Sequence, residues 1–158
     1  MTFHRLEPVF ASNPPARGSK TRHQTSDQAG KDTIPRGRIL VVEDDYFVGL
    51  TIESALTDAG FEVLALVTTG EEALVRASEL QPQLVLMDIR LAGQMDGIDT
   101  ARELRRVGIP SLFASAHSDP VTRSRGEKAE PMGWVTKPFS DAALIDAVTQ
   151  ALDRLSRQ

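Results

Sequence analysis

The feature that most constrains the fold of this chain is a series of five short apolar runs separated by amphipathic stretches. The runs lie near residues 39–43, 61–67, 84–88, 111–115 and 133–136. Each has the length of a β-strand, and each is continuously apolar, as expected of strands that are covered on both faces. Strands that alternate with helices form parallel sheets. The sequence therefore predicts an α/β protein with an open, doubly wound, five-stranded parallel sheet.

The stretches between the runs carry signals for helix ends. Asp45 can cap a first helix that ends at Gly60. Thr69-Gly-Glu-Glu72 has the spacing of a capping box and predicts the start of a second helix. A third helix is expected from about Gly97 to Val107. These signals place one helix after each of the first three strands.

The C-terminal third of the chain contains one weak and one strong helical segment. Asp119-Pro120 is a suitable start, but Gly126 and Pro131 oppose a long helix, so we expect a short, mobile or frayed helix with exposed polar residues. The last helix begins at Ser140-Asp141. We expect its apolar side chains to pack on the sheet rather than to form a dimer seam; they include Leu144, Val148, Leu152 and Leu155.

Composition and charge limit the domain organisation and the function classes. The chain has 158 residues and no cysteine, which suits one domain and excludes disulfides and thiolate metal sites. Residues 1–37 carry six basic and three acidic side chains, lack apolar periodicity, and predict a disordered or loosely packed tail before a domain at 38–158. That domain then carries the rest of the net charge of −4, which is −7, and disfavours non-specific nucleic-acid binding. No signal peptide or membrane span is evident, so we expect a cytoplasmic protein without membrane contact.

Polar side chains end four of the five apolar runs. They are Glu43 and Asp44, Asp88, Ser115 and Lys137. In open α/β sheets the functional crevice lies beyond the carboxyl ends of the strands, so we expect these groups to meet there. Three carboxylates gathered together favour a bound cation, and all-oxygen ligands suit Mg²⁺. An Asp beside such an ion, with Lys and Ser near phosphoryl oxygens, could act as a nucleophile and form an acyl phosphate.

Each of these residues also has a structural interpretation. Asp45 is better explained as the cap of the first helix than as a metal ligand. Taken alone, Asp88 could be a polar strand end, Ser115 small filler, and Lys137 a solvated charge. Their joint placement at the ends of the predicted strands favours the functional interpretation.

The motifs together resemble a known family. ILVVEDD, LVLMDIRLAGQMDGID, LFASAHSD and GWVTKPF, spread over about residues 38–156, resemble the receiver domain of bacterial two-component response regulators. The resemblance implies a flavodoxin-like (βα)5 fold with strand order 2-1-3-4-5. It also implies that Asp88 accepts a phosphoryl group from a sensor histidine kinase or a histidine phosphotransfer protein. The loop DIRLAGQMDG is one residue longer than the commonest receiver form.

The resemblance further assigns roles around Asp88. Asp44, Asp88 and the backbone carbonyl of Arg90 match the Mg²⁺ ligands, and Glu43 matches the second acidic position, which usually acts through metal-bound water. Lys137 matches the lysine that pairs with the phosphoacceptor, and the proline after it matches the family's cis proline.

The resemblance also implies a conformational switch. Ser115 matches the hydroxyl that turns toward the phosphoryl group, and Trp134 stands at the switch position, where Tyr or Phe is more common. Side chains at positions 90 and 117 are expected to tune the lifetime of the phosphoryl group; a metal role for His117 is not favoured, because no second soft ligand accompanies it. The weak fourth helix puts family-wide expectations of dimerisation through that face in doubt, and a homodimer through other faces stays open.

The leading hypothesis is therefore a single-domain response regulator that is phosphorylated on Asp88 and signals through protein contacts. It could end a pathway, act as a phosphate sink or relay phosphate onward. The alternatives are an aspartyl-phosphate phosphatase, a cobalamin-binding module and a receiver-like domain that is never phosphorylated. A phosphatase of this kind needs another Asp at position 90, and a cobalamin-binding module needs a His there, but this chain has Arg. The complete set of site residues argues against a receiver-like domain that is never phosphorylated.

Overall fold

The structure is a computed structural model and describes residues 34–116 and 119–158. The predicted tail up to residue 33, and His117, lie outside the described residues. Within them, five strands alternate with five helices: β1 Arg38–Val42, α1 Tyr46–Asp58, β2 Glu62–Val67, α2 Gly70–Leu80, β3 Leu84–Asp88, α3 Gly97–Arg106, β4 Ser111–Ser115, α4 Pro120–Glu127, β5 Trp134–Thr136 and α5 Asp141–Leu155.

The strands form one parallel sheet in the order β2-β1-β3-β4-β5, which confirms the predicted fold class and strand order. After β1 the chain moves to one edge to form β2, and then crosses back to form β3 on the other side of β1. The winding therefore reverses between β1 and β3. In such sheets a crevice forms at this point, beyond the carboxyl ends of the two strands.

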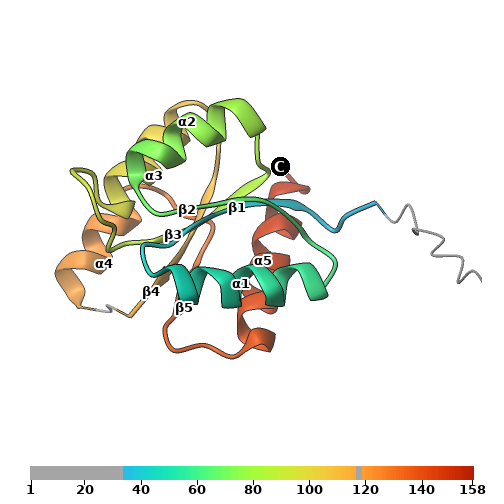
Figure 1. Cartoon of the computed structure of the whole chain (residues 1–158). Coiled ribbons are helices and arrows are strands. Elements are labelled where there is room, and N and C mark those ends of the chain that lie inside the picture. Colours follow the sequence, from blue (N-terminus) through green and yellow to red (C-terminus); the bar gives the residue numbers. More distant parts are fainter. Residues whose placement is uncertain (1–33, 117–118) are drawn as a thin grey trace, which may run out of the picture. The chain divides into compact units, whose positions relative to one another are not determined.

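Helices cover both faces of the sheet, with α1 and α5 on one face and α2 and α3 on the other (Figure 1). Successive residues of β1 face opposite sides, so that Ile39 and Val41 pack toward α1 and α5, whereas Leu40 and Val42 pack toward α2 and α3. This double coverage explains the continuous apolar runs inside β1, β3 and β4, whose polar residues stand at the strand ends. The edge strand β2 is only partly buried over most of its length.

The expected helix caps are present. The Asp45 carboxylate accepts hydrogen bonds from the amides of Phe47 and Val48, which confirms its structural interpretation. Thr69 caps α2 by accepting from the Glu72 amide, at 3.2 Å. These caps fix the residues at which α1 and α2 begin, and therefore the length of the loops that follow β1 and β2.

The two C-terminal helices differ as predicted. On α5, Leu144 and Val148 are buried in the core, and Leu152 and Leu155 pack against it. By contrast, α4 spans 8 residues, and its one buried residue is Gly126. Within the described residues, no helix is long and apolar enough to cross a membrane.

Candidate functional site

Three carboxylates meet where β1 and β3 end. Glu43 and Asp44 directly follow β1, and Asp88 is the last residue of β3. One oxygen from each lies within 4.8 Å of the others. Glu43 and Asp88 are buried, at 2% and 8% exposure, whereas Asp44 is exposed. The predicted convergence of the three acids is therefore present, with two members inside and one at the mouth.

Lys137 lies between the two buried carboxylates. Its ammonium donates to Asp88 Oδ2 at 3.1 Å and forms a short ion pair with Glu43 Oε2. The residue follows β5, its amide donates to the Ser115 carbonyl at 3.0 Å, and its bond to Pro138 is cis, as the family resemblance implied. The sheet therefore places the Lys137 ammonium beside Glu43 and Asp88, which are 94 and 49 residues away in the sequence.

The electrostatics of this group follow from burial and pairing. Burial raises the pKa of Glu43 above its ordinary value of 4.5, and the charge of Asp88 acts in the same direction, while Lys137 opposes both. For Lys137, burial would lower the pKa, but the hydrogen bond with Glu43 and the charge of Asp88 prevail and raise it above 10.5. Lys137 is therefore held in its charged form, and Glu43 accepts a proton more readily than a solvent-exposed glutamate would.

The backbone after Asp88 is held by two amide hydrogen bonds and by the close approach of Gly97. The Arg90 amide donates to Asp88 Oδ1 at 3.1 Å, and the Gly97 amide donates to the Ile89 carbonyl at 2.8 Å. A Cβ on Gly97 would lie 1.9 Å from the Asp88 carbonyl oxygen, so only glycine fits at the first position of α3. The sequence showed this glycine only as a helix start, because its close approach to β3 is a tertiary contact.

Glu71 of α2 holds the loop that separates Asp88 from α3. Its Oε1 accepts from the amides of Gln94 and Met95 at 3.1 and 3.2 Å. Its own backbone amide, followed by those of Gln94 and Met95, lowers the pKa of Glu71 below 4.5. No sequence signal indicates this role of Glu71, since a Glu in a first helical turn is expected on capping grounds alone.

The remaining predicted residues lie on β4, on β5 and in the loop after β3, and of these Ser115 and Arg90 lie at the strand-end edge. Ser115 ends β4 and is 3% exposed, and Trp134 begins β5, where its ring packs on Phe113 with centroids 4.8 Å apart. Arg90 is exposed, two residues after Asp88. The structure thus gathers Glu43, Asp44, Asp88 and Lys137 directly, with Ser115 at the end of the adjoining strand.

Comparisons with known proteins agree with this geometry. The family model for the response regulator receiver domain matches residues 39–149. The transcriptional regulatory protein PdtaR of Mycobacterium tuberculosis is 35% identical over 124 residues, which cover 77% of this chain and 58% of that protein. The DNA-binding response regulator MtrA of Mycolicibacterium smegmatis is 38% identical over 124 residues, covering 78% and 53%. The chain thus spans little more than half the length of these relatives.

Solved structures show the same relationship. The signal receiver domain of a modulated diguanylate cyclase from Desulfovibrio desulfuricans superposes with a TM-score of 0.72 at 30% identity, covering 77% of this chain and 97% of that one. A putative response regulator from Chloroflexus aurantiacus gives a TM-score of 0.70 at 30% identity, covering 77% and 100%. With its sheet order, its acidic strand ends and its half-buried lysine, this chain belongs to the response regulator receiver domain family.

Proposed function

We propose that this chain accepts a phosphoryl group on Asp88 from the phosphohistidine of a sensor histidine kinase or of a histidine phosphotransfer protein. The observation that carries the proposal is the setting of Asp88. Its carboxylate ends a central strand, contacts Lys137 and lies within reach of the same ion as Glu43 and Asp44. A buried carboxylate kept beside a cation is suited to act as a nucleophile toward phosphorus.

In the proposed step, a carboxylate oxygen of Asp88 forms a bond to phosphorus while the phosphorus–nitrogen bond to histidine breaks. The displaced imidazole nitrogen then takes up a proton. Lys137 holds the carboxylate beforehand and would hold a phosphoryl oxygen afterwards. Asp44, Asp88 and the backbone carbonyl of Arg90, with Glu43 nearby, would hold Mg²⁺, which would neutralise charge on the phosphoryl oxygens. We propose no catalysis beyond phosphorylation and dephosphorylation of the chain itself.

Phosphorylation would act on Ser115 and Trp134. It adds nearly two negative charges and strong hydrogen-bond acceptors at Asp88. Ser115 stands at the end of the strand next to β3, so its hydroxyl would turn toward those acceptors. We propose that Trp134 then moves inward and that the surface around it changes shape.

A surface for the phosphohistidine-bearing partner adjoins the site. On α1, Tyr46, Phe47 and Leu50 are 58%, 79% and 39% exposed, which is unusual for large apolar side chains. Beside them is a groove of about 410 Å³, lined on one side by α1 and on the other by Lys137 and Phe139. Because Lys137 belongs to both the groove and the acidic site, we propose that a partner helix docked here would present its histidine to Asp88.

The phosphoacceptor is tested by intact mass. The protein incubated with Mg²⁺ and acetyl phosphate, or with a cognate kinase, should gain one phosphate adduct. Asp88→Asn should gain none, and Asp58→Asn, at an exposed position near the end of α1, should behave as wild type. No adduct from either donor, or an adduct that survives Asp88→Asn, would refute the proposal.

The metal assignment is tested by thermal unfolding. Mg²⁺ should raise the melting temperature of the wild type, because a ligand that binds only the folded state stabilises it. The rise should be much smaller in Asp44→Ala. Equal stabilisation of both proteins would show that Asp44 does not hold the ion.

The proposed cellular role takes account of the net negative charge of residues 38–158, which disfavours binding to DNA. We propose a cytoplasmic, single-domain regulator that signals through protein contacts rather than through DNA. It would be an end regulator, a phosphate sink or a phosphorelay intermediate. The intact mass of the protein isolated from its own cells tests the single-domain form. A longer native protein would refute the single-domain form and leave the phosphoacceptor proposal standing.

A further inference from the structure

Besides packing on Phe113 of β4, the indole of Trp134 makes polar and cation–π contacts with one helix, α4. Arg123 lies over its ring, with the guanidinium carbon 4.2 Å from the ring centroid, and Glu127 Oε1 accepts from Nε1 at 2.9 Å. Arg123 Nε and Glu127 Oε1 are themselves 3.0 Å apart. These polar and cation–π contacts all come from α4, so the resting position of the indole depends on that helix.

A glycine in α4 provides the space for the ring. A Cβ at Gly126 would lie 2.4 Å from Cη2 and 2.7 Å from Cζ2 of Trp134. Real Cβ atoms do not approach other atoms so closely, so any larger residue would displace the indole. The glycine that weakens α4 as a helix therefore allows Trp134 to pack against it.

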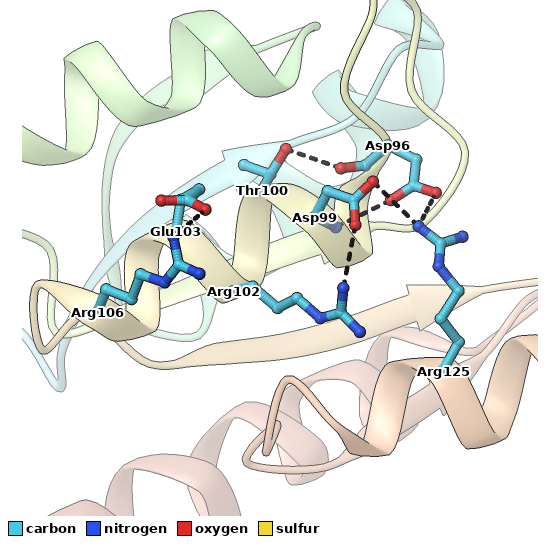
Figure 2. Close-up of polar contacts among 7 residues, drawn as sticks. All are labelled: Asp96, Asp99, Thr100, Arg102, Glu103, Arg106 and Arg125. Atoms are coloured by element: carbon cyan, nitrogen blue, oxygen red, sulfur yellow. Dashed lines mark hydrogen bonds and ion pairs between the residues drawn. The ribbon is translucent and has the colours of Figure 1, made fainter.

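The other attachments of α4 are polar. Arg125 reaches α3 and forms ion pairs with Asp96, the N-cap of α3, and with Asp99 at 3.1 Å (Figure 2). Val121, the large apolar residue of α4, is 77% exposed. Because α4 lacks an apolar face on the sheet, its position depends on Arg125 and on the contacts with Trp134.

We propose that Arg123, Glu127 and Gly126 form a latch that holds Trp134 in its resting position and opposes the phosphorylated conformation. This inference rests on the proposed function and names three positioning residues for its switch. Inward movement of the indole breaks the Nε1 bond to Glu127 and uncovers Arg123, and α4 is then attached through Arg125. Contacts made only in the resting state bias the equilibrium toward that state.

The size of this bias follows from the contacts. Loss of the side-chain hydrogen bond should favour the active conformation about fivefold, and loss of the cation–π contact about two- to fivefold. Because coupling between binding equilibria is reciprocal, the affinity for a phosphoryl mimic at Asp88 should rise by the same factors.

The test uses the fact that Trp134 is the one tryptophan of the chain, so that its emission reports the latch directly. Resting exposure is measured by acrylamide quenching without any phosphoryl mimic, and switching by titration with beryllofluoride in excess Mg²⁺. Glu127→Ala removes the acceptor and the charge, Glu127→Gln keeps an acceptor oxygen, and Arg123→Met removes the guanidinium. The matched control is Glu79→Ala, which breaks a similar surface pair with Arg76 on α2.

Glu127→Ala should decrease quenching at rest, because the inward position of the indole becomes more populated, and should lower the half-saturating beryllofluoride concentration about fivefold. Arg123→Met should act in the same direction, Glu127→Gln should have a smaller effect, and Glu79→Ala should match the wild type. Gly126→Ala should also decrease quenching and increase beryllofluoride affinity, although alanine favours helix formation. This variant separates loss of the latch from loss of helix stability.

Two outcomes would overturn the inference. One is that Glu127→Ala leaves both resting quenching and half-saturation unchanged, and the other is that Glu79→Ala changes them equally. Failure of the wild type to bind beryllofluoride would instead refute the proposed function. Resting quenching would still test whether Arg123 and Glu127 hold the indole, so the two failures are distinguishable.

Discussion

Replacement of Lys137 by methionine should destabilise the protein in a way that depends strongly on pH. Lys137 contacts both buried carboxylates, and methionine retains most of its length without the charge. Glu43 and Asp88 would then be buried as neighbouring negative charges, which costs several kcal/mol. The protein can limit that cost by protonating one of them, and Glu43, whose pKa burial already raises, is a candidate.

The magnitude follows from the pH. Keeping a carboxyl neutral at pH 7, when its ordinary pKa is 4.5, costs about 3.4 kcal/mol at 1.36 kcal/mol per pH unit. At pH 5 the same cost is about 0.7 kcal/mol. A raised pKa means that the folded state binds the proton more tightly than the unfolded state, so stability increases as the pH falls toward 4.5. The variant should therefore lose about 3 kcal/mol at pH 7 and under about 1 kcal/mol at pH 5.

The assay is urea unfolding followed by the emission of Trp134, at pH 5, 6 and 7 in the presence of a chelator. Lys128→Met, at the exposed C-cap of α4, is the matched control and should change stability by about 0.5 kcal/mol or less. Added Mg²⁺ should recover more stability in Lys137→Met than in the wild type, because both carboxylates are then without their ammonium partner. An equal loss at pH 5 and pH 7 would show that the lysine stem, not its charge, is what matters, and would refute the reasoning.

Three further substitutions test separate parts of the site and core. Gly97→Ala should cost about 3 kcal/mol or more, because its Cβ would meet the backbone of Asp88, which cannot move aside as a side chain can. Glu71→Ala should accelerate hydrogen exchange at the two loop amides that it accepts from, whereas Glu71→Gln should retain part of their protection. Because the pKa of Glu71 is lowered, the protection in the wild type should persist above pH 4.5 and be lost as the pH falls further. Ser111→Ala should be neutral or stabilising by about 1 kcal/mol, because Ser111 Oγ is buried without a hydrogen-bond partner among the described residues.

Each of these substitutions has an outcome that would contradict it. For Gly97 the control is Gly108→Ala. At Gly108 φ is +80° and an added Cβ would have no neighbouring atom within 4 Å, so only backbone strain of about 1 kcal/mol is expected. Equal costs at the two glycines would contradict the close approach to Asp88. Unchanged exchange in Glu71→Ala would show that the loop holds its shape without that side chain. A loss above about 1 kcal/mol in Ser111→Ala would reveal a partner for the hydroxyl.

The fold was predictable because its signals are local. Continuous apolar runs mark the inner strands, and caps such as Asp45 and Thr69 mark helix starts within a few residues. The acidic site was predictable for the same reason, since parallel strands end at one edge and their last residues must lie there. The short α4 followed from Gly126 and from missing periodicity.

The contacts between elements were not predictable in this way. Glu71 has the sequence of an ordinary first-turn acid, and Arg123 and Glu127 have the i, i+4 spacing of a solvated surface pair. No feature of the neighbouring sequence shows that Glu71 holds a loop 23 residues away. Nor does any show that Arg123 and Glu127 contact Trp134. Such roles depend on how α2 and α4 lie against other elements, and one sequence does not encode that pairing visibly.

The charge balance of the site explains why the proposed function uses both a lysine and a metal ion. Glu43, Asp44 and Asp88 against Lys137 leave two net negative charges at the strand ends. Lys137 pairs with the two buried acids, and the charge that it leaves uncompensated equals that of one divalent cation. A phosphoryl group on Asp88 would add nearly two more negative charges. We therefore expect phosphorylation and Mg²⁺ binding to strengthen each other, because the cation lowers the cost of placing that charge beside Glu43 and Asp44.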